Sequence, residues 1–96
     1  NIGLEPITPP EFLYHGTAKQ FIASIRRDGL IPRKRNHVHL SQDEQTAQTV
    51  GKRHGVAIVL VIRAAEMQAK GYQFYLSANH VWLTEKVPTE FIGFPP

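Results

Sequence analysis

The sequence predicts an α+β fold, because short apolar strands outnumber helices and the helical patterns fall early in the chain. The strand pattern is plainest in the β-branched run 56–62, and the helical pattern in the apolar positions of 18–27. Ninety-six residues suit one domain with one modest core. No internal repeat and no low-complexity segment divides the chain.

Each element follows from apolar periodicity and from the turn residues beside it. Residues 1–10 hold three prolines and predict an extended linker, so the domain is expected over 11–96. Run 56–62 is expected as a central strand buried on both faces. The strands are expected at 12–15, 37–40, 56–62, 74–76, 81–84 and 91–94, and the helices at 18–27, 42–50 and 64–70.

Two apparent capping boxes set the expected helix starts. Thr17 with Gln20 predicts a helix directly after Thr17, and Ser41 with Glu44 predicts the next one. The second helix has a thin apolar face and is expected on the surface. Gly51 is expected to end it and to open a loop over 52–54.

The stretch Phe12 to Thr17 is the first candidate for a site. An apolar strand ends there at His15, Gly16 and Thr17, and Gly16 lets a ligand or another backbone approach closely. A helix N-terminus after Thr17 would offer backbone N–H groups to a phosphate. A second strand with histidines, 37–40, strengthens this candidate.

Charge and composition narrow the class of partner. The net charge is only +3, but basic residues cluster at 26–35 and at 52–54, which favours a polyanion such as RNA, DNA or a dinucleotide. A solvated basic face is the alternative. The chain has no cysteine and no long apolar run, so we expect a soluble protein of a reducing compartment, the cytoplasm, with no membrane partner.

The residue types point to phosphate chemistry that depends on arginine and histidine. The eight acidic residues are dispersed, and no P-loop, nucleophile elbow or GxGxxG is present. His37 and His39 share one face of a strand. They are open to three interpretations: zinc ligands with His15 or His54, one buried and one surface histidine, or hydrogen-bond partners of a ribose or phosphate. The first is disfavoured, so no metal is expected.

Five ordered blocks resemble the C-terminal domain of the RNA (tRNA) 2′-phosphotransferase family, over residues 11 to 94. The resemblance implies an ADP-ribosyltransferase-like split β-sheet core with short flanking helices, and NAD as a consumed co-substrate. It implies that an RNA 2′-phosphate attacks the nicotinamide ribose, and that a ribose hydroxyl then attacks the phosphorus. The blocks are Leu13–Thr17, Gly29–Leu30, Arg35–Ser41, Val50–Gly55 and Val81–Pro88.

The resemblance also implies roles for single residues. His15, His39 and Val81 resemble the NAD-site triad of ADP-ribosyltransferases, with a valine where many of those enzymes have glutamate. Arg35 resembles a catalytic arginine that holds the transferring phosphate. The catalytic set is therefore expected to be Arg35, His39 and Val81; the NAD-binding set His15, Gly16, Thr17, His39 and Ser41; and the RNA- or phosphate-binding set Arg35, Arg53 and His54.

The expected partners are 2′-phosphorylated RNA, NAD and the N-terminal domain of the family. That winged-helix-like domain supplies an Arg-His pair and a further arginine, and it is absent from these residues. The isolated domain is therefore expected to bind NAD weakly at best and to be inactive or weakly active. Two alternatives stay open: a mono-ADP-ribosyltransferase that modifies nucleic-acid phosphate ends, and a non-catalytic module that binds NAD or ADP-ribose.

Overall fold

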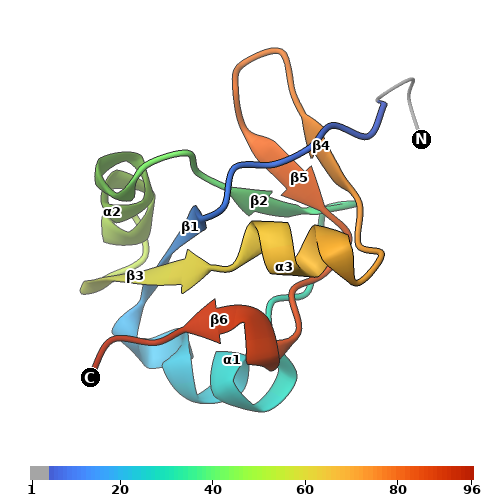
Figure 1. The fold of residues 1–96 in the computed structure, drawn as a ribbon. Helices are drawn as coiled ribbons and strands as arrows, with labels where there is room; N and C mark the ends of the chain where they lie inside the picture. The colour runs from blue at the N-terminus through green and yellow to red at the C-terminus, as the bar shows by residue number, and fades with distance from the viewer. Residues whose placement is uncertain (1–4) are drawn as a thin grey trace.

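Two small antiparallel sheets form the frame of the protein in the computed structural model, which describes residues 5–96 (Figure 1). The first has the order β1-β3-β6 and the second the order β2-β5-β4. The expected α+β class with a split sheet is thereby confirmed. The strands are β1 Leu13–Ala18, β2 Val38–Leu40, β3 Ala57–Ile62, β4 Phe74–Leu76, β5 Trp82–Thr84 and β6 Ile92–Gly93.

The two sheets are joined where β1 passes the end of β2. Tyr14 N–H donates to the Ser41 carbonyl at 2.9 Å, and Ser41 N–H donates to the Tyr14 carbonyl at 2.7 Å. This single bridge holds the edge of one sheet against the edge of the other. His15 and His39, each beside a bridging strand end, are therefore brought together by backbone hydrogen bonds.

Three short helices and two 3₁₀ turns surround the sheets. A 3₁₀ turn, Lys19–Phe21, leads into α1, and a second one, Thr89–Phe91, leads into β6. The helix α2 packs against β1 and β3, and α1 packs against the 3₁₀ turn that leads into β6 (Figure 1). No helix within 5–96 is long and apolar enough to cross a membrane. The helices are α1 Ile22–Asp28, α2 Glu44–Lys52 and α3 Ala64–Ala69.

The prediction that a helix begins directly after Thr17 is wrong. β1 continues to Ala18, because Thr17 pairs with Ile58 of β3 and is buried. The 3₁₀ turn then intervenes, and neither its first residue nor that of α1 has a side-chain cap. The phosphate-docking helix N-terminus expected after Thr17 is therefore not formed. The end of α1 agrees with expectation, since Gly29 has the positive φ of 76° that suits glycine.

The second helix, α2, differs from the expected one at both ends and in its surroundings. Its cap is Asp43, whose carboxylate accepts from Thr46 N–H at 2.7 Å, so Ser41 and Glu44 do not form the expected capping box. Gly51, expected as the start of a loop, lies inside the helix and is buried. The expected surface position is wrong on one side, because this side lies directly on β1.

The long apolar run is central in its sheet but is not buried on both faces. Val56 precedes β3 and is 68% exposed, and only Leu60 and Ile62 of the strand are buried. These two face the core, whereas α2 covers only part of the other face. The remaining elements agree closely with expectation: α3 ends before Gly71, β4 has the predicted bounds, and β5 starts one residue late.

The core lies between the two sheets and under α3. The residue Trp82 is 4% exposed and contributes to this core. Residues 5–10 form neither helix nor strand, and Ile7 N–H donates to the Phe74 carbonyl at 2.8 Å, while 1–4 of the expected linker lie outside the described residues. The largest fully buried side chains are Phe74, Leu13, Leu40, Leu60, Ile62, Met67, Val87 and Thr84.

Candidate functional site

The outer face of the second sheet carries the second histidine strand. In its register, Leu40 pairs with Trp82, and both face the core. His39 pairs with Leu83, so both side chains lie on the opposite face. Continued by one residue, this register places Val81 opposite Ser41 on the same face as His39. Strand pairing thus puts these predicted residues of β2 and β5 on one surface.

His15 lies between the two sheets and reaches the backbone of His39. Its Nδ1 is 3.0 Å from the His39 carbonyl oxygen. A carbonyl only accepts, so Nδ1 carries the proton and Nε2 presents a lone pair in the neutral ring. Burial lowers the pKa of His15, the hydrogen bond to the His39 carbonyl opposes this, and repulsion from His39 and His54 in their protonated forms lowers it further. His15 is therefore held as a neutral, oriented imidazole.

Arg35 contacts the ring of His39 directly. Its Nη1 lies 2.6 Å from Nδ1 and 3.2 Å from Nε2 of the exposed imidazole. A guanidinium nitrogen this close to both ring nitrogens lies over the imidazole ring, so the contact does not assign the ring proton to either one. Partial burial lowers the pKa of His39 first, and the charges of Arg35 and His37 lower it further. The result is a permanent cation held against a neutral histidine ring.

The other two residues of the His-Gly-Thr motif point in opposite directions. Thr17 follows His15 by two residues, so it shares its face and is buried. Gly16 faces α2: a Cβ there would lie 1.7 Å from the carbonyl oxygen of Ala47. The close approach expected at Gly16 is therefore made by another backbone, that of α2.

Arg53 and His54 end α2 at an exposed corner. The His54 ring meets the ring of Phe21 edge-on, with centroids 6.3 Å apart. Its charge lowers the pKa of His15, which places it within electrostatic reach of that ring. Arg53 is exposed beside it. These two predicted residues thus belong to the same basic region but do not contact His39 or Arg35 in the hydrogen bonds of the described chain.

Val81 is fixed by its backbone at the start of β5. Its N–H donates to Ser77 Oγ at 3.1 Å, and its carbonyl accepts from Ser77 N–H at 2.9 Å. The turn before it contains His80 with a positive φ of 65°. The valine side chain brings no charge to the surface beside His39. The groups that perturb His15 and His39 are histidines and an arginine, with no carboxylate among them.

The zinc interpretation of the histidines finds no geometric support among residues 5–96. No group of three or more His, Cys, Asp or Glu side chains in this range is placed to hold a metal ion. His37 instead meets Tyr75 edge-on, with ring centroids 5.6 Å apart. His15 and His39 are engaged by a carbonyl oxygen and a guanidinium. The histidines thus act as hydrogen-bonding and packing groups in this structure.

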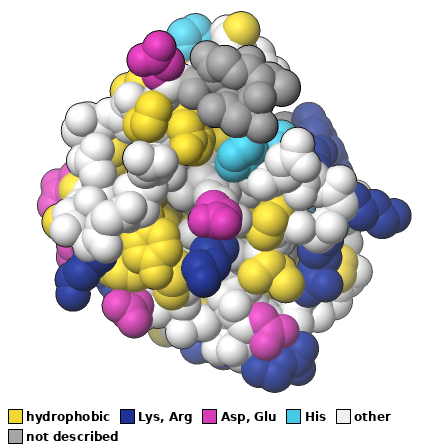
Figure 2. Space-filling view, turned by 90° about the vertical axis from the view of Figure 1, so that its right-hand side faces the viewer, with side chains coloured by type: hydrophobic (Ala, Val, Ile, Leu, Met, Phe, Trp, Pro, Cys, Tyr) yellow, Lys and Arg dark blue, Asp and Glu magenta, His cyan; other side chains and the backbone are white. Residues whose placement is uncertain are grey.

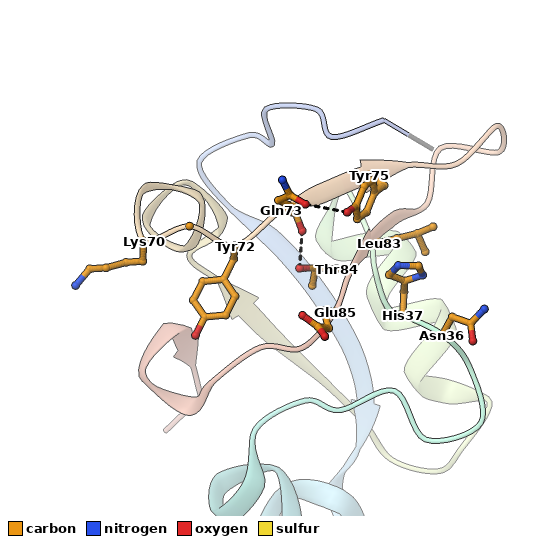
Figure 3. A pocket seen from close by; sticks show the side chains of 10 residues that line it. Asn36, His37, Lys70, Tyr72, Gln73, Tyr75, Leu83, Thr84 and Glu85 are labelled. Atoms are coloured by element: carbon orange, nitrogen blue, oxygen red, sulfur yellow. Dashed lines mark hydrogen bonds between the residues drawn. The ribbon is translucent and has the colours of Figure 1, made fainter. Parts of the chain in front are cut away.

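A groove of about 830 Å³ opens next to this surface (Figure 3). Asn36 and His37 lie at one end of it and Lys70 and Tyr72 at the other. Sequence reasoning missed Tyr75, Gln73 and Glu85 here. The signal would have been the pairing of β4 with β5, which the sequence alone did not supply. The full lining is Asn36, His37, Lys70, Gly71, Tyr72, Gln73, Tyr75, Leu83, Thr84 and Glu85.

The charge on the surface is uneven. On the face seen in Figure 2, Lys and Arg side chains gather along the right-hand edge, and hydrophobic and mixed charged side chains occupy the middle. The groove itself has one basic and one acidic side chain, Lys70 and Glu85. The site around Arg35 is therefore suited to phosphate, and the groove to a ligand that is largely uncharged.

Sequence comparison adds an independent observation. The pattern of the family described as "RNA 2'-phosphotransferase, Tpt1 / KptA family" matches residues 1–86. A protein of Pectobacterium carotovorum named "Probable RNA 2'-phosphotransferase" is 56% identical over 92 residues, which are 96% of this chain and 50% of that protein. Proteins of the same name from Acaryochloris marina (53% over 91 residues, 95% and 50%) and Escherichia coli strain K12 (51% over 85 residues, 88% and 46%) are also similar. The chain spans about half the length of these relatives.

Proposed function

The chain belongs to the RNA 2′-phosphotransferase family, and we propose that it is the part of such an enzyme that binds NAD and the RNA 2′-phosphate. The observation that carries the proposal is the hydrogen-bonded chain His15–His39–Arg35 at the junction of the two sheets. It joins two oriented neutral imidazoles to a permanent cation. A dinucleotide and a phosphate dianion both suit such a site.

In the proposed reaction, the RNA 2′-phosphate attacks the anomeric carbon of the nicotinamide ribose of NAD. The C–N bond breaks, and nicotinamide leaves with its electron pair. The neighbouring ribose hydroxyl then attacks the phosphorus, the bond to the RNA 2′-oxygen breaks, and this oxygen takes up a proton. RNA with a free 2′-hydroxyl and ADP-ribose cyclic phosphate are the products. A phosphate dianion is already a nucleophile, which fits a surface that has valine at position 81 and no acid beside His39.

Arg35 would hold the transferring phosphate, because its guanidinium stays charged through both steps. His39 would offer the N–H of its neutral ring to a ribose or phosphate oxygen. His15 would position His39 through its carbonyl and offer its own Nε2 as an acceptor to a ribose hydroxyl. The role of His15 uses the tautomer that its hydrogen bond to the His39 carbonyl sets.

The other proposed residues act at the edges of this site. Ser41, on the His39 surface, would contact NAD with a hydroxyl. Gly16 and Thr17 would shape the NAD pocket from within, as they fix α2 and the floor beside His15. Arg53 and His54 would contact RNA phosphates from the exposed end of α2.

The proposed partner within the full-length protein is a further domain that completes the active site. The relatives are about twice as long as this chain, so the other half of such a protein is available for this role. We therefore propose that this chain alone binds NAD or ADP-ribose weakly and turns over little or no RNA. The natural RNA, tRNA included, and a cytoplasmic location are part of the same proposal.

A titration of the chain with ADP-ribose and with NAD, followed by NMR, tests the proposal. The expected result is saturable shifts of the His15 and His39 rings with a 1:1 stoichiometry and millimolar or better affinity. The variant Arg35→Ala should reduce single-turnover cleavage of 2′-phosphorylated RNA in the longer protein far more than it reduces ADP-ribose affinity. Arg27→Ala, an exposed arginine paired with Asp28, is the matched control.

Three outcomes would contradict the proposal. The absence of any response to millimolar ADP-ribose or NAD would exclude the cofactor site. Equal losses of affinity and rate for Arg35→Ala would assign Arg35 to cofactor binding alone. A stable ADP-ribosyl product on RNA ends, in place of dephosphorylated RNA, would show a mono-ADP-ribosyltransferase.

A further inference from the structure

The groove beside the candidate site has an ordered polar and aromatic lining. Tyr75 pairs with Leu83, and Leu83 pairs with His39, so these three side chains form one rung across the outer face of the second sheet. The groove therefore continues the surface that carries His39. Asn36 and His37 line its near end and follow Arg35 directly in the chain. A ligand held at Arg35 would therefore lie next to this end of the groove.

Hydrogen bonds within the groove fix its side chains before any ligand binds. The Tyr75 hydroxyl donates to Gln73 Oε1 at 3.1 Å, and Thr84 Oγ1 donates to the Gln73 carbonyl at 2.9 Å (Figure 3). The amide of Gln73 is thereby oriented, and its Nε2 keeps two N–H donors for a ligand. The ring of His37 packs edge-on against Tyr75 at 61°. Aromatic faces and oriented amide donors thus lie side by side.

The size and charge of the groove select one ligand class. Its volume of about 830 Å³ lies within the roughly 300–1,000 Å³ of small-molecule sites. Glu85 and Lys70 oppose each other in sign, so the groove is not a phosphate site. The Glu85 carboxylate accepts from amino or imino groups, Gln73 and Asn36 donate and accept, and Tyr75 and His37 offer ring faces. A flat heterocycle with donors and acceptors on its edge, a nucleobase, matches this set.

We propose that this groove binds an unpaired nucleobase of the RNA substrate, next to the nucleotide whose 2′-phosphate lies at Arg35. The inference rests on the proposed function, since it takes Arg35 as the phosphate site. His37 is two residues from Arg35, a backbone separation of at most about 7 Å, so the near end of the groove lies within one nucleotide's reach of a phosphate held at Arg35. The groove would therefore take the adjacent base and select RNA in which that base is unpaired.

The test compares an intact RNA with one that lacks the neighbouring bases. The probes are a 2′-phosphorylated trinucleotide and the same trinucleotide with abasic nucleotides on both sides of the phosphate. Affinity is measured on the wild-type chain and on Tyr75→Leu and Gln73→Ala. Phe12→Leu, an exposed aromatic outside the groove, is the matched control.

The groove variants should bind the intact RNA at least about fivefold more weakly, whereas their affinities for the abasic RNA and for ADP-ribose should equal those of the wild type. The control should match the wild type with all three ligands. An equal loss for intact and abasic RNA, or no loss for either, would overturn the proposal. Shifts of the Tyr75 ring on addition of ADP-ribose alone would also overturn it, because the groove would then belong to the cofactor.

If a groove variant does not fold, the proposal can still be tested directly on the wild-type protein. Titration with adenosine or guanosine in the presence of saturating ADP-ribose should shift the Tyr75 and His37 rings, and an absence of shifts overturns the proposal. Failure of the proposed function has a different signature, since His15 and His39 would then not respond to ADP-ribose. Failure of the groove proposal alone leaves that response intact and removes only the dependence on the base.

Discussion

The substitution Gly51→Ala should destabilise the protein, although alanine normally stabilises a helix interior. Gly51 lies within α2, where the change from glycine to alanine gains about 1 kcal/mol in an exposed helix. Here the new Cβ would lie 2.6 Å from the backbone carbonyl oxygen of Thr17 and 3.2 Å from the Cβ of Ala57. Neither the Thr17 carbonyl nor the Ala57 methyl group can rotate away as the end of a long, flexible side chain could. The helix or the strand must move.

The size of the effect follows from that contact. Ordinary contact begins at 3.4 Å, so α2 and β1 must separate by about 0.8 Å, the difference from 2.6 Å. Overpacking of this kind costs about 1–3 kcal/mol, and a backbone contact that cannot relax falls in the upper part of this range. Subtracting the helix-propensity gain of about 1 kcal/mol leaves an expected net loss of up to about 2 kcal/mol, or up to about 1 M in the urea midpoint for a protein of this size.

Urea unfolding followed by the fluorescence of Trp82 measures this loss, because the single tryptophan is 4% exposed in the folded state. Gly93→Ala is the matched control: its Cβ would meet Val61 at 3.6 Å, an ordinary contact, so its free energy of unfolding should stay within about 0.5 kcal/mol of the wild-type value. A Gly51→Ala protein as stable as the wild type, or more stable, would refute the close packing of α2 on β1.

Three further predictions concern the same region. Gly16→Ala should destabilise more than Gly51→Ala, or prevent folding, since its Cβ would lie 1.7 Å from a backbone oxygen of α2; a midpoint near the wild-type value would contradict this. Asp43→Ala should lower the urea midpoint and fray the start of α2, since the carboxylate that accepts from Thr46 N–H is lost, and slower amide exchange there would oppose it. Burial and neighbouring positive charges lower the pKa of His15 below 6.5 in the folded state, so the unfolded chain takes up more protons as the pH falls below about 6.5. The free energy of unfolding should therefore fall from pH 7 to pH 5. His15→Asn, which keeps a donor for the His39 carbonyl, should reduce that slope, and His39, whose pKa is also lowered, should supply the remainder.

The sequence predicted elements well where local signals and tertiary packing agree. The helix α3 and the strand β4 were placed from apolar runs and from Gly71 between them. The two capping boxes failed because tertiary contacts decided both positions: Thr17 is buried in a strand pair with Ile58, and Ser41 bridges to Tyr14. A short-range pattern cannot report a partner that lies far away in the chain.

Gly51 was misinterpreted for a related reason. Glycine in a sequence has two physical uses, to break a helix or to let two backbones approach, and the sequence shows only the residue. In this fold the second use applies, and Gly16 on β1 makes the opposite half of the same contact. The two glycines together let α2 lie close against β1. This pairing cannot be recognised when each glycine in the sequence is interpreted alone.

The candidate site was predicted in its residues but not in its surroundings. His15, Arg35 and His39 were proposed from their places at the ends of two expected strands and from blocks that resemble a family pattern, and the structure brings their side chains and backbone into contact. Tyr75 and Gln73 carry no motif. They reach the site only because β5 lies between β2 and β4, an order that apolar periodicity does not encode.

The split sheet explains how such a site arises from few residues. A continuous sheet would also pair the free edge of β1 with β2 along its whole length and would leave no place where the two strands meet only at one point. Here one bridge, Tyr14 to Ser41, holds the strands together, and the histidines beside it make their hydrogen bond across the junction. His39 is then held at two points: its carbonyl accepts from the ring of His15, and its own ring contacts Arg35. The ring of His15 is thus oriented by a carbonyl that only accepts, and the ring of His39 is held by a guanidinium that stays charged, so no carboxylate takes part in holding either imidazole.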